Sequence, residues 1–130
     1  MVDRFDLSGK RALITGGGRG LGREMAQAFA EHGADVIIAS RKLDVLEQTA
    51  AEIAEATGRT ITAKACHVGE WEQVSRLADE VYAEFGRVDV LVNNAGMSPL
   101  YESLSAVTED LWRKVIDVNL TGPFRLSALV

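Results

Sequence analysis

The chain has 130 residues and a net charge of −5, and 47% of its residues are apolar. This length is enough for one domain with a sizeable core, and the acidic balance argues against a nucleic-acid surface because the 14 Lys and Arg residues are scattered. No apolar run is long enough to cross a membrane and the first residues lack the pattern of a signal peptide, so we expect a cytoplasmic domain with no membrane partner.

Strand and helix patterns alternate along the chain, starting with an apolar strand that leads into a helix. Gly33, Gly58 and Gly86 stand where helices are expected to stop. After a loop, Thr108 is placed to cap a further helix that carries Leu111. The periodicity predicts strands at residues 11–15, 36–39, 60–66 and 88–92, and helices at residues 21–32, 43–57 and 71–85.

This alternation predicts an α/β fold, a Rossmann-type, doubly wound parallel sheet in a single domain over residues 1–130. Residues 88–92 carry no Pro or Lys that would protect a sheet edge, so a fifth strand is expected beside them. In such sheets ligands bind at the carboxyl ends of the strands. Four segments fall at this edge and form the candidate binding site: residues 16–22, 40–41, 67–68 and 93–96.

The segment that joins the first strand to the first helix is the most informative motif. Gly16, Gly20 and Gly22 follow the pattern G-x-x-x-G-x-G there. Glycines let the chain turn tightly and let phosphate oxygens approach the backbone. The helix start adds free N–H groups and the positive end of the helix dipole. The segment therefore predicts a site for the diphosphate of a dinucleotide.

The end of the second strand indicates which dinucleotide. Sheets that bind NAD place an acidic residue at this point, whereas this chain has Ser40, Arg41 and Lys42. A guanidinium binds a 2′-phosphate that a carboxylate would repel, and Arg19 in the glycine loop adds a second cation. We interpret this set as selecting NADP(H). The alternative is that Arg41 and Lys42 belong only to a solvated helix start.

The cysteine and the two histidines predict no further chemistry. Cys66, the one cysteine, excludes an internal disulfide and is expected to be a buried, unreactive thiol. Neither His32 nor His67 has a Cys, a His or a carboxylate at ligand spacing, so no metal site is expected.

Two more motifs follow in the chain, Asn93-Asn94-Ala95-Gly96 and Asn119-Leu120-x-Gly122. With the glycine loop before them, the chain resembles the short-chain dehydrogenase/reductase family over essentially its whole length. The resemblance implies a cofactor-binding Rossmann-type domain in which the diphosphate, the ribose phosphate and the nicotinamide ribose are bound in turn. The residues implied for NADP(H) are Gly16, Gly18, Arg19, Gly20, Leu21, Gly22, Ser40, Arg41, His67, Val68, Asn93, Ala95 and Gly96.

His67 departs from the family pattern, whereas Asn119 matches it. The family pattern has an aspartate in place of His67, which reaches the adenine amino group. Val68 should still offer its backbone to adenine, whereas His67 either accepts through one ring nitrogen or lies on the surface.

Asn119 matches the family's catalytic asparagine, whose main-chain carbonyl holds a water. Pro123 has no N–H, so this carbonyl loses its helical partner; the other interpretation is a simple kink at Gly122 and Pro123.

The serine and the Tyr-x-x-x-Lys pair of the family have no match, because neither Tyr82 nor Tyr101 is followed by a lysine at the fourth position. Residues 124–130 are an apolar helical pattern with no stop signal. We therefore expect the cofactor-binding half of a longer enzyme that transfers hydride between nicotinamide and a small-molecule carbonyl or secondary alcohol. The 130 residues themselves should be inactive, and the complete protein a homo-oligomer. The alternative is a non-catalytic dinucleotide-binding module.

Overall fold

The computed structural model describes residues 2–130, which form a parallel four-stranded sheet with the strand order β3-β2-β1-β4. The central strands β1 and β2 pair in register from Arg11 opposite Asp35 to Thr15 opposite Ala39. The strands are β1 (Arg11–Thr15), β2 (Asp35–Ser40), β3 (Ile61–Ala65) and β4 (Val90–Val92).

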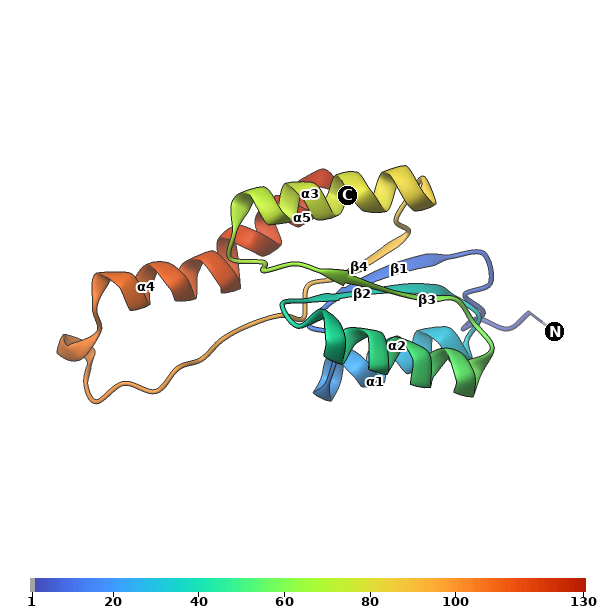
Figure 1. Cartoon of the computed structure of the whole chain (residues 1–130), viewed down its shortest axis with the longest axis horizontal. Helices are drawn as coiled ribbons and strands as arrows, with labels where there is room; N and C mark the ends of the chain where they lie inside the picture. The colour runs from blue at the N-terminus through green and yellow to red at the C-terminus, as the bar shows by residue number, and fades with distance from the viewer. Residues whose placement is uncertain (1) are drawn as a thin grey trace.

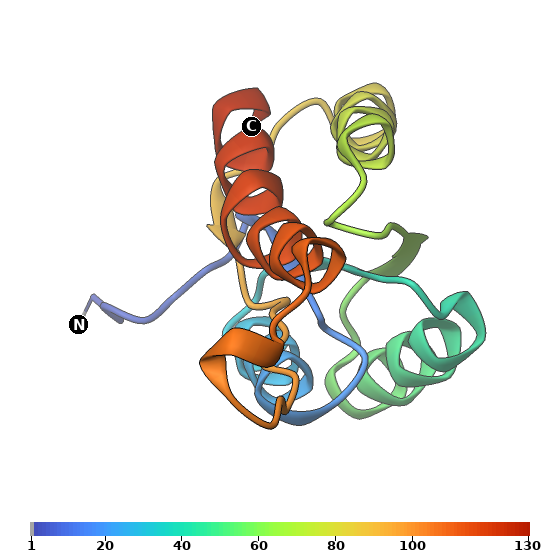
Figure 2. The ribbon, with the colours of Figure 1, turned by 90° about the vertical axis from the view of Figure 1, so that its left-hand side faces the viewer.

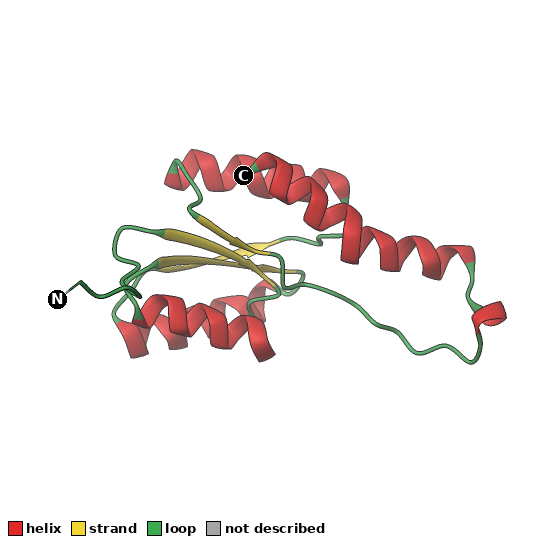
Figure 3. Cartoon of the chain, turned by 180° about the vertical axis from the view of Figure 1, so that it is seen from behind, coloured by secondary structure: helices red, strands yellow, loops and turns green. Residues whose placement is uncertain are grey.

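Helices cover both faces of this sheet. Figure 1 shows α1 (Gly20–Glu31) and α2 (Leu43–Thr57) on one face, and α3 (Trp71–Phe85) and α5 (Gly122–Leu129) on the other. The same two layers of helices flank the strands when the molecule is seen from behind (Figure 3). The predicted Rossmann-type, doubly wound arrangement is therefore confirmed.

The core is split into two clusters by the sheet. Leu13 and Ile37 contribute to the cluster under α3 and α5, whereas Ile14 and Ile38 contribute to the cluster under α1 and α2. Successive residues of a strand point to opposite faces, so a strand that is covered on both sides must be apolar at every position. This explains the uninterrupted apolar run in β2. Packing on both faces also holds the ends of the strand in a fixed position.

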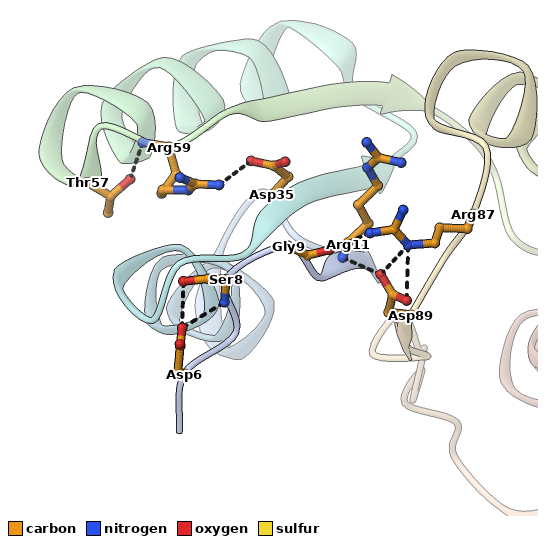
Figure 4. A network of polar contacts seen from close by, with 9 residues as sticks. All are labelled: Asp6, Ser8, Gly9, Arg11, Asp35, Thr57, Arg59, Arg87 and Asp89. Atoms are coloured by element: carbon orange, nitrogen blue, oxygen red, sulfur yellow. Dashed lines mark hydrogen bonds and ion pairs between the residues drawn. The ribbon is translucent and has the colours of Figure 1, made fainter. Parts of the chain in front are cut away.

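The amino edge of the sheet is held by polar contacts (Figure 4). The Asp89 carboxylate accepts a hydrogen bond from the Arg11 backbone N–H at 2.8 Å and pairs with the Arg87 guanidinium at 3.1 Å. The Arg59 guanidinium pairs with the Asp35 carboxylate at 2.8 Å. These contacts tie together the starts of the strands at the end of the sheet opposite to the candidate site.

The predicted bounds agree for β1, α2 and α3, and differ by one residue at either end of α1, β2 and β3. The prediction of a strand over residues 88–92 was too long, because β4 contains only Val90–Val92. Asp89 instead binds the Arg11 backbone N–H through its side chain. Within residues 2–130, β4 pairs only with β1 and is half-buried.

The last part of the chain is one long helical segment with an irregular turn. It consists of α4 (Glu109–Ile116), the π-helical turn η2 (Asp117–Thr121) and α5, and a short 3₁₀ turn η1 (Leu104–Ala106) precedes it. As predicted, the Thr108 hydroxyl caps α4 by accepting from the Leu111 backbone N–H at 3.1 Å. Figure 2 shows α4 in front of α5, with α3 beside α5. Figure 1 shows that α4 extends past the carboxyl ends of the strands.

Candidate functional site

A pocket with a volume of about 800 Å³ lies at the carboxyl ends of the strands. This volume is in the range of small-molecule and cofactor sites in proteins. All four strand ends and the last turn of α4 contribute to its wall. The lining residues include Gly16, Gly18, Arg19, Gly20, Ser40, Arg41, Lys42, His67, Val68, Asn94, Ala95, Gly96, Met97, Lys114 and Asp117.

The glycine loop takes its shape from close contacts with its surroundings. The Gly16 N–H donates to the Ala39 carbonyl at 2.7 Å, and the Gly18 carbonyl accepts from the buried Thr49 hydroxyl at 2.9 Å. A Cβ on Gly22 would lie 2.1 Å from the Gly16 carbonyl oxygen, so no other residue fits this position without displacing the backbone. The loop is thus pressed against the first turn of α1.

The start of α1 is suited to an anion. Its N-cap, Arg19, makes no capping hydrogen bond through its side chain, and the first turn contains no acidic residue. The N–H groups of a first helical turn have no partner within the helix, and the helix dipole adds positive potential there. A phosphate group placed at this end of the pocket would satisfy these donors.

The cations that were predicted to bind the 2′-phosphate line the pocket, two of them just after β2 and one in the glycine loop. Arg19, Arg41 and Lys42 all contribute to the wall, together with Ser40. Among the described residues none of these three cations forms an ion pair. Their charge is therefore available to a ligand rather than neutralised within the chain.

The segment after β4 is tied to the end of β1. The buried Thr15 hydroxyl accepts from the backbone N–H groups of Asn94 and Ala95, each at 3.1 Å. The Asn94 side-chain amide donates to the Gly16 carbonyl at 3.2 Å. These bonds hold Ala95 and Gly96 at the pocket wall, with Ala95 next to Gly16.

Cys66 and His67 follow β3 and lie at the wall of the pocket. Cys66 is only 2% exposed, and burial raises the pKa of its thiol to about 11, so it stays protonated at neutral pH. His67 is half-buried, and its ring nitrogen Nδ1 accepts a hydrogen bond from the Gly69 backbone N–H at 3.0 Å. The expected buried thiol is confirmed, and His67 lines the pocket while it remains partly exposed.

Asn119 lies in the π-helical turn and faces the segment after β4 with its side chain. Its Oδ1 accepts from the Met97 backbone N–H at 2.8 Å, and its Nδ2 donates to the Met97 carbonyl at 2.7 Å. The Gly122 N–H donates to the Asp117 carbonyl, five residues back. The turn before Pro123 is therefore widened, and both the oxygen and the nitrogen of the Asn119 side chain bond to the Met97 backbone.

Gly122 is required where this turn meets β3. A Cβ at this position would lie 2.0 Å from the Val68 carbonyl oxygen. The contact brings the irregular turn against the strand end that also carries His67, so the long helical segment closes one side of the pocket.

Not every predicted residue reaches the pocket wall. Gly22 is buried against Gly16, Leu21 is 78% exposed, and the Asn93 side chain donates to the Ser127 hydroxyl at 3.0 Å. Asn119 contacts Met97 and does not line the pocket. Lining residues outside the list of cofactor contacts implied by the family are Ala39, Lys42, Val45, Cys66, Gly69, Glu70, Asn94, Met97, Lys114, Asp117 and Val118.

Only some of these additional lining residues could have been found from the sequence. Lys42 and Asn94 lie inside motifs that had been singled out, beside Arg41 and Asn93. Lys114 lies in α4, and Asp117 is the first residue of η2. The orientation of these two elements depends on the long loop before α4 and on the irregular turn itself, and no local pattern gives that orientation.

Two other kinds of site are absent from residues 2–130. No cluster of His, Cys, Asp or Glu side chains that could hold a metal ion is found there. No helix in that part of the chain has the length and apolar character needed to cross a membrane.

Comparison with known proteins places the chain in a family. The sequence profile of the short chain dehydrogenases matches residues 10–130. A short chain dehydrogenase/reductase of Macrophomina phaseolina is 40% identical over 98% of this chain and 73% of its own length. The chain therefore belongs to the short-chain dehydrogenase/reductase family of oxidoreductases.

Further relatives agree in sequence and in structure. The human dehydrogenase/reductase SDR family member 4 is 35% identical over the whole chain and 46% of its own length. The crystal structure of L-sorbose reductase from Gluconobacter frateurii with NADPH and L-sorbose superposes with a TM-score of 0.92 at 30% identity, over 96% of this chain and 47% of that one. A metagenomic short-chain oxidoreductase in complex with NADP gives a TM-score of 0.91 at 34% identity, over 95% and 55%. Apart from the first, these proteins are about twice as long as the chain.

Proposed function

We propose that residues 1–130 form the NADP(H)-binding part of an oxidoreductase that transfers hydride between nicotinamide and a carbonyl or secondary alcohol. The observation that carries this proposal is that Arg19, Ser40 and Arg41 line one pocket with the glycine loop. The relatives that were solved with NADPH or NADP have the same fold, which supports the same class of ligand here.

Each group of residues would bind a different part of the nucleotide. The first turn of α1 and the loop Gly16 to Gly22 would hold the diphosphate, because free N–H groups and the helix dipole converge there. Ser40 and Arg41 would bind the 2′-phosphate, which a guanidinium contacts through two parallel hydrogen bonds. Ala95 and Gly96 would lie along the nicotinamide ribose.

The chemistry itself would need only a few of these residues. Bound in this pocket, the reduced nicotinamide supplies the hydride. The glycine loop and Arg41 would hold the ring in position relative to a substrate, which lowers the entropic part of the barrier. The side chain of Asn119 is occupied by Met97, so its contribution to a proton relay would come through its main-chain carbonyl. The tyrosine acid/base of the family, its substrate residues and a homo-oligomeric interface would lie in the complete protein.

A titration of Arg41→Ala with NADPH and NADH tests the assignment. Loss of a charge-assisted pair to the 2′-phosphate should weaken NADPH binding by about tenfold or more and leave NADH binding unchanged. Arg59→Ala is the matched control, since Arg59 pairs with Asp35 at the opposite end of the sheet. Equal weakening of both nucleotides by Arg41→Ala, or no effect on either, would contradict the proposal.

A further inference from the structure

We infer that His67 recognises the base of the bound nucleotide by donating a hydrogen bond to it from Nε2–H. This inference rests on the proposed function, because it needs a purine dinucleotide in the pocket. It makes His67 a specificity-determining residue that tolerates a base with a carbonyl oxygen in place of the amino group, whereas an acceptor at this position would discriminate against that base.

The strand order determines where the base would lie. The glycine loop follows β1, Arg41 follows β2, and His67 follows β3, which is the next strand outward in the order β3-β2-β1-β4. The base is bonded to the ribose whose phosphate is assigned to Ser40 and Arg41. A nucleotide that runs from the diphosphate site through this ribose therefore places its base at the end of β3, where His67 lines the pocket.

His67 is held in place at three of its four polar atoms. Its backbone N–H donates to the Gln73 side-chain carbonyl at 2.8 Å, and its carbonyl accepts from the Glu70 N–H at 3.0 Å. The ring nitrogen Nδ1 accepts from the Gly69 N–H at 3.0 Å. Within residues 2–130 no hydrogen bond to the remaining atom, Nε2, is present, and His67 is one of the residues that line the pocket.

The contact with Gly69 also fixes the ring orientation. A Cβ on Gly69 would lie 2.9 Å from the His67 Cε1 atom, so the ring packs directly on the glycine backbone. A side chain at position 69 would displace the imidazole and break the bond to Nδ1. The ring edge that carries Nδ1 and Cε1 therefore faces Gly69.

The tautomer follows from this bond. A neutral imidazole carries one proton, and a nitrogen that accepts a hydrogen bond does not carry it. With Nδ1 accepting from Gly69, the proton of neutral His67 is on Nε2. The nitrogen that could have accepted a hydrogen bond from the adenine amino group is Nδ1, and it already accepts one from the Gly69 N–H.

A donor at this position recognises different atoms of the base than an acceptor does. Nε2–H can donate to a ring nitrogen of adenine, but not to its amino group, which is itself a donor. In hypoxanthine the amino group is replaced by a carbonyl oxygen, which accepts equally well. The structure therefore predicts that the site tolerates a hypoxanthine dinucleotide, whereas a carboxylate in place of His67 would repel that oxygen.

Fluorescence titrations with NADPH and with its hypoxanthine analogue test this directly. The wild-type chain should bind the two within about threefold of each other, because each base offers an acceptor to His67, a ring nitrogen in adenine and the carbonyl oxygen in hypoxanthine. His67→Asp should bind the hypoxanthine analogue about tenfold more weakly than NADPH, since two acceptors then face each other. Thermal unfolding of the variant, and His67→Ala as a second variant with no preference, control for a change in the fold.

Two results would overturn the inference. One is a wild-type preference for NADPH over the analogue as large as that of His67→Asp. The other is a proton on Nδ1 in the ¹⁵N NMR spectrum of the nucleotide-free chain, which reports the tautomer independently of binding. Failure of both nucleotides to bind overturns the proposed function and this inference with it, while the NMR spectrum still reports on the ring.

Discussion

At the scale of single residues, glycines determine how closely the backbone segments around the pocket approach. Gly22 faces the Gly16 carbonyl, and Gly122 faces the Val68 carbonyl, so both contacts are backbone against backbone. Neither partner can move away as a flexible side chain would. The shape of the pocket therefore depends on two glycines that do not line it, and one of them, Gly22, was predicted as a cofactor contact.

Two alanine substitutions distinguish the energetic cost of a close contact from the cost of an unfavourable backbone conformation. Gly22→Ala should lower the free energy of unfolding by about 3 kcal/mol, because its Cβ must displace a carbonyl. Gly20→Ala should cost only about 1 kcal/mol, since Gly20 has a φ of 57° but open space around it. Urea unfolding of both variants measures this difference. Equal destabilisation would show that the close contact is not maintained.

The Cys66 thiol should be unreactive in the folded chain. At pH 8 only about one thousandth of a thiol with a pKa of about 11 is ionised, and the side chain is also inaccessible. A thiol reagent should therefore label the native chain far more slowly than the chain in urea. Labelling of the native chain as fast as of the unfolded chain would contradict the burial of Cys66.

At the scale of elements, the amino edge of the sheet joins β1 to β4 through Asp89. The hydrogen bond from the Arg11 backbone N–H, and then the Arg87 guanidinium, hold the pKa of the Asp89 carboxyl below its ordinary value of 3.8. A carboxyl whose pKa is lowered by folding stabilises the fold above its ordinary pKa. That contribution is lost as the pH falls through the lower, folded-state value.

Comparison with Asp89→Asn isolates this contribution. The variant keeps an acceptor for the Arg11 N–H but loses the charge that Arg87 pairs with. Wild type should be the more stable of the two at pH 7, and the difference should disappear as the pH falls below about 3.8. Urea midpoints of both proteins over this range test the sign. A difference that grows toward low pH would contradict it.

How well an element was predicted depends on whether its signals are local. The bounds of α2 and α3 were correct because Gly58 and Gly86 adopt the left-handed conformation that ends a helix. The α4 cap at Thr108 is equally local. The length of β4 and the side of α4 that faces the pocket were not predictable, because Asp89 binds a residue 78 positions away and α4 follows a long loop.

At the scale of the whole molecule, the topology was the most predictable feature. Alternating strands and helices imply parallel strands, and parallel strands bring their carboxyl ends to one edge. The glycine loop, Arg41, His67 and Gly96 meet in one pocket for this reason. What the topology could not give is how side chains pair at that edge. The bonds from Asn119 to Met97 and from Gly69 to His67 depend on distances of tenths of an ångström.

The 130 residues should bind the reduced nucleotide without turning it over. Among the described residues neither tyrosine lines the pocket: the Tyr82 hydroxyl donates to the Val130 carbonyl, and Tyr101 is 54% exposed in the loop before α4. A mixture with NADPH and small aldehydes or ketones should show no oxidation of NADPH above the background. Measurable turnover would mean that another group of the chain serves as the acid.

The central claim is that this pocket selects a dinucleotide by its 2′-phosphate, and isothermal titration of the unmodified chain with NADPH and NADH tests it most directly. Arg19, Arg41 and Lys42 line the pocket without ion-pair partners among the described residues. A phosphate that reaches these charges should make NADPH bind about tenfold more tightly than NADH, or more. Equal dissociation constants for the two nucleotides would contradict the claim.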